Sequence, residues 1–282
     1  MPNRAMLSGF PRDGAAWLAF GLFWALLFAL AAAEQWRPLH RGGEEPRGRI
    51  PANFGLGLLN AGLATLLPVS TVASAAWAAR HGIGLMHAVP LPAAAAIPAT
   101  LLLRSLAVWL IHRASHAVPI LWRAHRVHHA DVRLDLSTGL RNHPLELVYV
   151  ASWLAAVTVA FGFDPAALAV YEAVAVAFAL WSHANLGLPP RLDAALRRVL
   201  VTPAMHHVHH SSRRAETDSN YGDVLSLWDR WFGTYFELDR EALVATRFGL
   251  GDDFDGDASS LAGQLRGPFR GPPPGAAAAS EA

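Results

Sequence analysis

The chain has 282 residues, of which 53% are hydrophobic and 16% are charged, against about 25% charged in an ordinary soluble domain. Together with a mean hydropathy of +0.26, this argues against a disordered, collagen-like or coiled-coil protein and indicates an integral membrane protein. The sequence has no cysteine, which excludes disulfide scaffolds, cysteine zinc sites, iron–sulfur clusters and thiol nucleophiles. A net charge of +1 disfavours nucleic acid as a partner.

Four long apolar stretches follow in chain order. Residues 14–33 carry no charge and are long enough to cross a hydrocarbon core of about 30 Å as a helix. Residues 53–79 contain Pro68, a predicted kink; residues 85–111 are interrupted by three prolines and Arg104; residues 145–181 are divided by a predicted turn at 162–165. We therefore predict an all-α membrane bundle of four to five helices. The first stretch could be a signal peptide, but its apolar run exceeds the usual core of 7–15 residues, so we expect it to be retained.

Arginine asymmetry predicts the orientation of these helices. Arginines are frequent in residues 34–52, 113–141 and 191–214 and rare in the intervening connections. By the positive-inside rule this alternation predicts five spans with the N-terminus outside. The histidine-rich stretches and the C-terminus would then form a cytoplasmic helical cap. Residues 251–282, rich in Asp, Gly, Pro and Ala, are predicted to be a disordered tail.

Histidine is the unusual residue, because eleven of the fourteen lie between His112 and His210. Three groups have helical one-face spacing: His112 and His116; His125, His128 and His129; His206, His209 and His210. Adjacent pairs diverge by about 100° on a helix, so one helix can serve two ions. Eight imidazoles exceed the needs of one metal and suit two, and His143 and His183 could complete the shells. All-nitrogen ligands leave zinc, copper, iron and nickel open; two such ions at a membrane surface suggest iron and oxygen chemistry.

The remaining histidines are expected to have other roles. His207 lies off the face of its neighbours and is predicted to support the ligands. His40, His81 and His87 are predicted to be surface or internally satisfied residues, and His40 is expected to lie far from the clusters.

Three stretches, His112-Arg113-Ala114-Ser115-His116, His125-Arg126-Val127-His128-His129 and His206-His207-Val208-His209-His210, resemble the histidine boxes of the fatty acid hydroxylase/sterol desaturase superfamily. The segments 141–146 (Arg-Asn-His-Pro-Leu-Glu), 183–185 (His-Ala-Asn), 220–223 (Asn-Tyr-Gly-Asp) and 227–235 are similar to further motifs of that family. The resemblance covers about residues 100–240, a predicted catalytic domain preceded by N-terminal membrane helices at 1–99. Many members carry Asp seven residues before the first box, where this chain has Ser105.

The resemblance implies a membrane-embedded, non-haem di-iron oxygenase that hydroxylates or desaturates a lipid using O2 and two electrons. It implies these metal ligands: His112, His116, His125, His128, His129, His183, His206, His209 and His210, with His143 as a further candidate. Ligating imidazoles usually donate their other N–H to an acceptor, and the residues expected to support them are Glu146, Asn185, His207, Asn220, Asp223 and Asp229. Arg104 and Glu172 interrupt apolar stretches and are expected either to pair with each other or to face water.

Two other functional classes remain open. A histidine-rich metal transporter or storage protein would place ionisable ligands at mid-membrane depth and often shows repeated halves; a zinc-dependent membrane hydrolase would need fewer histidines and a general base. For the oxygenase, a sterol, fatty acyl chain, sphingoid base, carotenoid or ether lipid are all possible substrates. No flavin-binding or cytochrome-like segment is recognisable, so a separate electron donor of reductase, ferredoxin or cytochrome type is implied.

Overall fold

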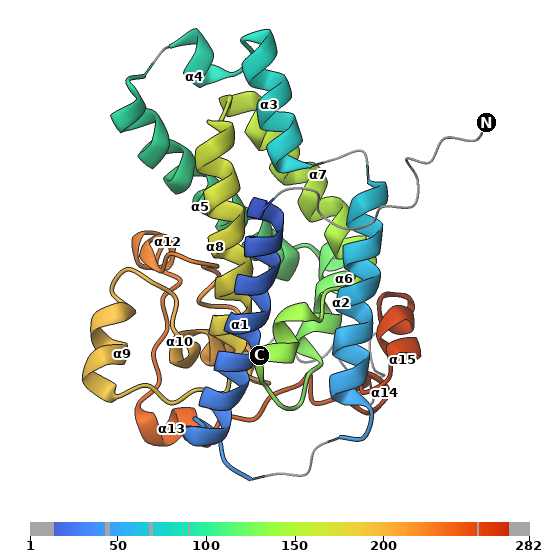
Figure 1. Ribbon diagram of the computed structural model, residues 1–282. Helices are drawn as coiled ribbons and strands as arrows, with labels where there is room; N and C mark the ends of the chain where they lie inside the picture. The colour runs from blue at the N-terminus through green and yellow to red at the C-terminus, as the bar shows by residue number, and fades with distance from the viewer. Residues whose placement is uncertain (1–13, 43–45, 68–69, 90, 253, 271–282) are drawn as a thin grey trace, which may run out of the picture.

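The computed structural model describes residues 14–42, 46–67, 70–89, 91–252 and 254–270, and this part of the chain is helical, with only two isolated bridges between extended residues. Long helices form a bundle: α1 (Gly14–Trp36), α2 (Arg49–Leu66), α3 (Thr71–His81), α5 (Ala93–Ala117), α7 (Pro144–Phe161) and α8 (Pro165–His183). The short α4 (Leu85–Ala88) lies with α3 at one end of the bundle, and most of the short helices gather at the other (Figure 1). The prediction of an all-α membrane bundle is confirmed, whereas the cytoplasmic side of the cap stays a prediction.

Four helical stretches are long and apolar enough to cross a membrane, namely Arg49–Ala88, Ala94–Ala117, Pro144–Phe161 and Pro165–His183. Phe20–Trp36 is a shorter apolar stretch of α1, so the count agrees with the predicted four to five. The predicted turn separates α7 from α8: Gly162 ends α7 with a left-handed φ of 67°, and Asp164 caps α8. The predicted kink at Pro68 lies outside the described residues.

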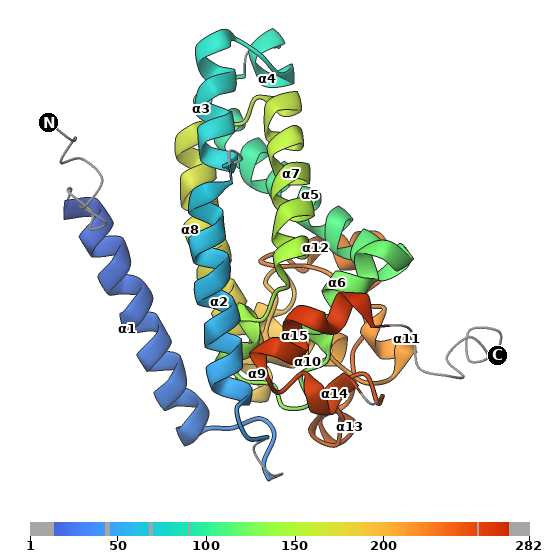
Figure 2. The same cartoon turned by 90° about the vertical axis from the view of Figure 1, so that its right-hand side faces the viewer.

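α1 joins the bundle through its C-terminal half. Leu27 and Leu30 pack against Leu180 and Ala184 at the end of α8, whereas the N-terminal end of α1 leans away from the other helices (Figure 2). α1 is therefore fixed to the bundle near the cap.

Arg104 and Glu172 form an ion pair between α5 and α8, confirming one of the two expected arrangements. The guanidinium Nε and Nη2 each lie 3.0 Å from a carboxylate oxygen, and Thr71 of α3 donates to the same carboxylate at 2.9 Å. Arg104 is 3% exposed, and a charge in such surroundings is stable only when it is paired. The pair fixes the register of helices that carry the first histidine box and His183.

The cap contains α6 (Pro119–His129), the 3₁₀ helix η2 (Leu136–Leu140), α9 (Pro190–Leu196), α10 (Pro203–His209), α11 (Arg214–Thr217), α12 (Leu227–Trp231) and α13 (Arg240–Val244). α6 follows α5 directly, since Pro119 ends one helix and occupies the first turn of the next. The first two histidine boxes are thereby brought into contact.

The prediction of a disordered tail is wrong for residues 254–270. They form α14 (Phe254–Asp257), α15 (Leu261–Arg266) and the 3₁₀ helix η3 (Gly267–Phe269). Phe254 packs on Val127 of α6, and the buried Gln264 donates to Asn53 of α2 at 2.9 Å. These few apolar and amide contacts hold the segment on the folded protein although its composition is polar. Residues 271–282 lie outside the described part of the chain.

Candidate metal centre

Nine of the ten predicted ligand histidines converge in two adjacent groups. The five-histidine group comprises His112, His116, His125, His129 and His209; the four-histidine group comprises His128, His183, His206 and His210. Within each group one ring nitrogen from every residue lies within 4.8 Å of the others. The adjacent pairs His128–His129 and His209–His210 are each divided between the groups, which is the divergence of about 100° that helix geometry predicts.

The ring nitrogens inside each group are closer than ordinary packing requires. In the four-histidine group, Nε2 of His183 lies 3.1 Å from Nε2 of His128, 3.0 Å from that of His206 and 3.2 Å from that of His210. In the five-histidine group, Nε2 of His125 lies 3.1–3.2 Å from its counterparts on His112, His116 and His129. Each group is thus a cluster of Nε2 atoms around a common centre.

Backbone carbonyls fix the tautomers of several of these rings. Nδ1 of His112 lies 2.8 Å from the Tyr221 carbonyl, that of His128 lies 3.2 Å from the Arg141 carbonyl, that of His183 lies 2.6 Å from Ala179 and that of His209 lies 2.6 Å from Ser219. A carbonyl only accepts, so Nδ1 must carry the proton and the neutral ring presents a lone pair at Nε2.

Those lone pairs face one another. His128 and His183 both present an unprotonated Nε2, so the 3.1 Å between these atoms joins two acceptors and contains no hydrogen bond. Nε2 of His209 is buried with no hydrogen-bond partner among the described residues. Crowded, buried lone pairs repel each other unless a cation lies between them, so the donor set fits one metal ion in each group.

Burial keeps these imidazoles neutral. It holds the pKa of His128, His129, His206 and His210 well below the usual 6.5, and it lowers the pKa of His209 to about 3. Neutral imidazole is the form that binds metal.

Two carboxylates contact the outer nitrogens of the five-histidine group. Glu146, predicted for this role, lies 2.7 Å from Nδ1 of His125, and Asp218 lies 3.2 Å from Nδ1 of His116. Asp218 was not among the expected residues, because it stands eight positions beyond the last box and belongs to none of the quoted motifs. Only the fold brings α11 beside α5.

The other residues expected to support the ligands form no hydrogen bond to a ligand ring and instead bind backbone groups of the cap. His207 contacts the His183 carbonyl through Nε2 at 3.2 Å, and Asn185 binds both backbone groups of His40. Asn220 adopts a left-handed φ of 54° and bonds to the backbone of Phe236.

Asp223 and Asp229 also stabilise the loops of the cap rather than a box histidine. Asp223 accepts from Tyr171 at 3.0 Å. Asp229 accepts from Trp109 at 2.9 Å and from the backbone N–H groups of Tyr221 and Gly222 at 2.8 and 2.9 Å. Because the Tyr221 carbonyl contacts His112, Asp229 holds the loop that orients this histidine.

His143 lies outside both groups. Its Nδ1 accepts the Leu145 N–H at 3.1 Å, which caps α7, and its Nε2 lies 3.2 Å from the Leu265 carbonyl. Both nitrogens are therefore engaged in holding α7 and the C-terminal segment. Ser105, at the position of the missing Asp, accepts from Trp228 at 3.1 Å and contacts no box histidine.

His40 does not lie far from the clusters, contrary to expectation. Its Nε2 lies 3.0 Å from Nδ1 of His207, and the two rings are nearly parallel with 5.1 Å between centroids. The connection between α1 and α2 carries His40 to the cap, a contact across 167 residues that no local pattern reveals. His81, by contrast, is exposed and contacts the Trp77 carbonyl one turn earlier in its own helix.

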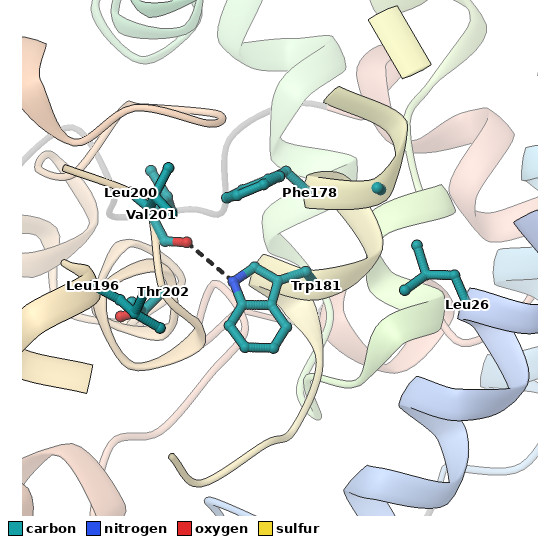
Figure 3. A pocket seen from close by; sticks show the side chains of 8 residues that line it. Leu26, Phe178, Trp181, Leu196, Leu200, Val201 and Thr202 are labelled. Atoms are coloured by element: carbon teal, nitrogen blue, oxygen red, sulfur yellow. Dashed lines mark hydrogen bonds between the residues drawn. The ribbon is translucent and has the colours of Figure 1, made fainter. Parts of the chain in front are cut away.

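An apolar cavity of about 280 Å³ lies beside the centre, between α1, α8 and the cap, with Leu26, Phe178, Trp181 and Leu200 among its lining residues (Figure 3). The Trp181 indole donates to the Val201 carbonyl at 3.1 Å. Residues two positions apart on a helix point about 200° apart, so Trp181 and His183 occupy opposite faces of α8. The cavity therefore lies on the side of α8 that faces away from the four-histidine group.

Fold and site together define a membrane helical bundle whose cap holds two groups of histidines, each arranged so that it could hold a metal ion. Residues 97–234 match the family described as fatty acid hydroxylase. This segment is similar to that family, which confirms the resemblance drawn from the motifs.

Several curated proteins are similar to part of this chain. Human alkylglycerol monooxygenase is 36% identical over 137 residues, which are 47% of this chain and 28% of the human protein. The Caenorhabditis elegans alkylglycerol monooxygenase is 31% identical over 134 residues, 47% of this chain and 25% of that protein. Ornithine lipid hydroxylase OlsE of Rhizobium tropici is 29% identical over 143 residues, 48% of this chain and 40% of that protein. The chain thus spans less than half the length of each relative. No solved structure matches it.

Proposed function

We propose that the protein is a multi-pass membrane di-iron oxygenase that hydroxylates a lipid. The observation that carries this proposal is the opposition of buried Nε2 lone pairs at 3.1–3.2 Å in two adjacent groups. The five-histidine and four-histidine groups would each hold one iron ion. Two irons bound there would share the electrons that an external donor delivers for O2 activation, which attack on an unactivated C–H bond requires.

The chain's own residues hold and shield that chemistry. Carbonyls and carboxylates fix the ring tautomers, the Arg104–Glu172 pair fixes α5 against α8, and the ligand atoms are almost entirely enclosed by protein. Such enclosure excludes bulk water from the reacting centre.

The names of the relatives guide the choice of substrate. They are called monooxygenases and hydroxylases of alkylglycerols and ornithine lipids, so these two classes of lipid are the first substrates to test. We further propose that the metal centre lies on the cytoplasmic side, as arginine asymmetry predicts, and that a separate protein delivers the electrons.

The test is made on the full chain purified in detergent. We expect about two iron ions per chain, and O2 consumption that depends on an added reductase system and on an alkylglycerol or ornithine lipid. Mass spectrometry should find a product that carries one added oxygen atom. Zinc together with lipid hydrolysis would favour the hydrolase instead, and metal uptake into vesicles without O2 consumption would favour the transporter.

A further inference from the structure

The two histidine groups differ in how their outer nitrogens are held. In the five-histidine group every Nδ1 has a partner: Asp218 for His116, Glu146 for His125, Thr217 for His129, and carbonyls for His112 and His209. In the four-histidine group, carbonyls hold only His128 and His183. Nδ1 of His206 and of His210 is buried with no hydrogen-bond partner among the described residues.

This difference bears directly on metal affinity. A carboxylate that accepts the Nδ1 proton makes the imidazole a stronger base at Nε2 and fixes its orientation. Where Nδ1 has no partner, binding a metal through Nε2 forces the proton onto a buried nitrogen without an acceptor, which is unfavourable. The five-histidine group also offers one more ligand.

We propose that the two groups bind their metal ions in order, the five-histidine group first and more tightly, and that Glu146 and Asp218 create much of this difference. The ligand is a divalent first-row metal ion. The inference rests on the proposed function, because it takes both groups to be metal sites. It assigns Asp218 a role in tuning His116 that its position outside the three histidine boxes does not suggest.

The geometry favours Glu146 as the stronger of the two partners. Its oxygen lies 2.7 Å from His125, against 3.2 Å for Asp218 and His116. The other oxygen of Asp218 is bound by Arg214 at 2.5 Å, which draws negative charge away from the histidine. Removing Glu146 should therefore weaken the first metal more than removing Asp218.

The experiment is an anaerobic titration of the metal-free, full-length protein with Co²⁺, followed by visible absorption and by bound metal per chain. The wild-type protein should bind two ions in two resolved steps. Glu146→Gln should weaken the first step 10- to 100-fold, Asp218→Asn should weaken it less, and the second step should stay within about threefold. Asp223→Asn is the matched control: it alters a cap carboxylate that contacts Tyr171 and no box histidine, so neither step should move.

Other outcomes separate the inference from the proposed function. Two steps of equal affinity in the wild-type protein would overturn the binding order and leave a two-metal centre in place. Equal weakening of both steps in Glu146→Gln would overturn the role of Glu146. No bound metal at all would overturn both proposals. Should Glu146→Gln fail to fold, stepwise removal of metal from the wild-type protein by a chelator still decides the order, since one ion must leave well before the other.

Discussion

The ring of His40 lies parallel to that of His207, with 16° between the ring planes and 3.0 Å between His40 Nε2 and His207 Nδ1. His207 contacts the His183 carbonyl through Nε2, so its Nε2 carries the proton and its Nδ1 is an acceptor. His40 donates to this Nδ1 when its single proton is on Nε2, and the 3.0 Å contact is shorter than the 3.4 Å between His40 Nδ1 and the Val244 carbonyl. The loop between α1 and α2 is thereby connected through two imidazoles to the backbone of a residue in the four-histidine group.

His40→Ala should therefore lower the stability of the cap. The change leaves Nδ1 of the fully buried His207 without a donor, which costs about 1–3 kcal/mol. We expect a lower melting temperature in detergent and faster proteolysis of the loop at residues 37–42. His81→Ala, at an exposed histidine, is the control and should leave the melting temperature unchanged; equal melting temperatures for both variants would contradict the assigned contact.

The parts of this architecture that sequence predicts are those that depend on local pattern. The lengths of the apolar stretches predict the membrane helices. The spacing of the histidines predicts which of them lie on each face of α6 and α10, because the pitch of a helix fixes the direction of every side chain. The split of His128 from His129 follows from that pitch alone.

The parts that sequence missed depend on contacts between distant segments. Asp218 reaches His116 across 102 residues, and Gln264 reaches Asn53 across 211. His143 has the right residue type within a family motif, but its position at the start of α7 turns it into a cap. The composition of residues 254–270 led to the wrong prediction of disorder. A short helix needs only a few buried side chains, such as Phe254 and Ala258, to dock on a folded surface.

Arg104→Met should destabilise the helix bundle by about 3 kcal/mol, because it leaves Glu172 without its cation. The double variant Arg104→Met/Glu172→Gln should recover part of this loss, since no unpaired charge remains. Unfolding of the wild-type protein, both single variants and the double variant gives the coupling free energy. A coupling near zero would show that the pair contributes nothing to holding α5 against α8.

The absence of cysteine from the sequence allows the proposed orientation to be tested by single-cysteine labelling. His81→Cys lies at the α3 end of the bundle, and Glu241→Cys lies on α13 in the cap at the opposite end (Figure 1). In intact cells a membrane-impermeant maleimide should label His81→Cys, and it should label Glu241→Cys only after permeabilisation. The reverse pattern would place the metal centre outside the cytoplasm.

His128→Ala and His129→Ala should each remove about one metal ion per chain, but from different groups. His128 belongs to the four-histidine group and His129 to the five-histidine group, so each change opens one coordination position. We expect both variants to lose lipid oxidation and to keep about one ion, measured by elemental analysis beside His81→Ala. Full activity with two ions in His129→Ala would show that this residue is structural.

Stability of the metal-free protein should fall steeply as the pH is lowered through 6. Burial depresses the pKa of His206, His207, His209 and His210 in the folded cap, that of His209 to about 3. The unfolded chain takes up these protons below about pH 6.5, whereas the folded protein does not, so the unfolded state binds more protons and gains stability as the pH falls. The stabilisation is fully present above about pH 6.5 and is lost toward pH 3 for His209, at up to about 1.4 kcal/mol per histidine and pH unit.

Melting temperatures measured in detergent should therefore be level between pH 8 and 7 and drop sharply between pH 6.5 and 5. Bound metal should shift this drop to lower pH, because metal and protons compete for the same Nε2 atoms. A melting temperature that stays constant from pH 8 to 5 in the metal-free protein would contradict the assignment of these buried imidazoles as neutral.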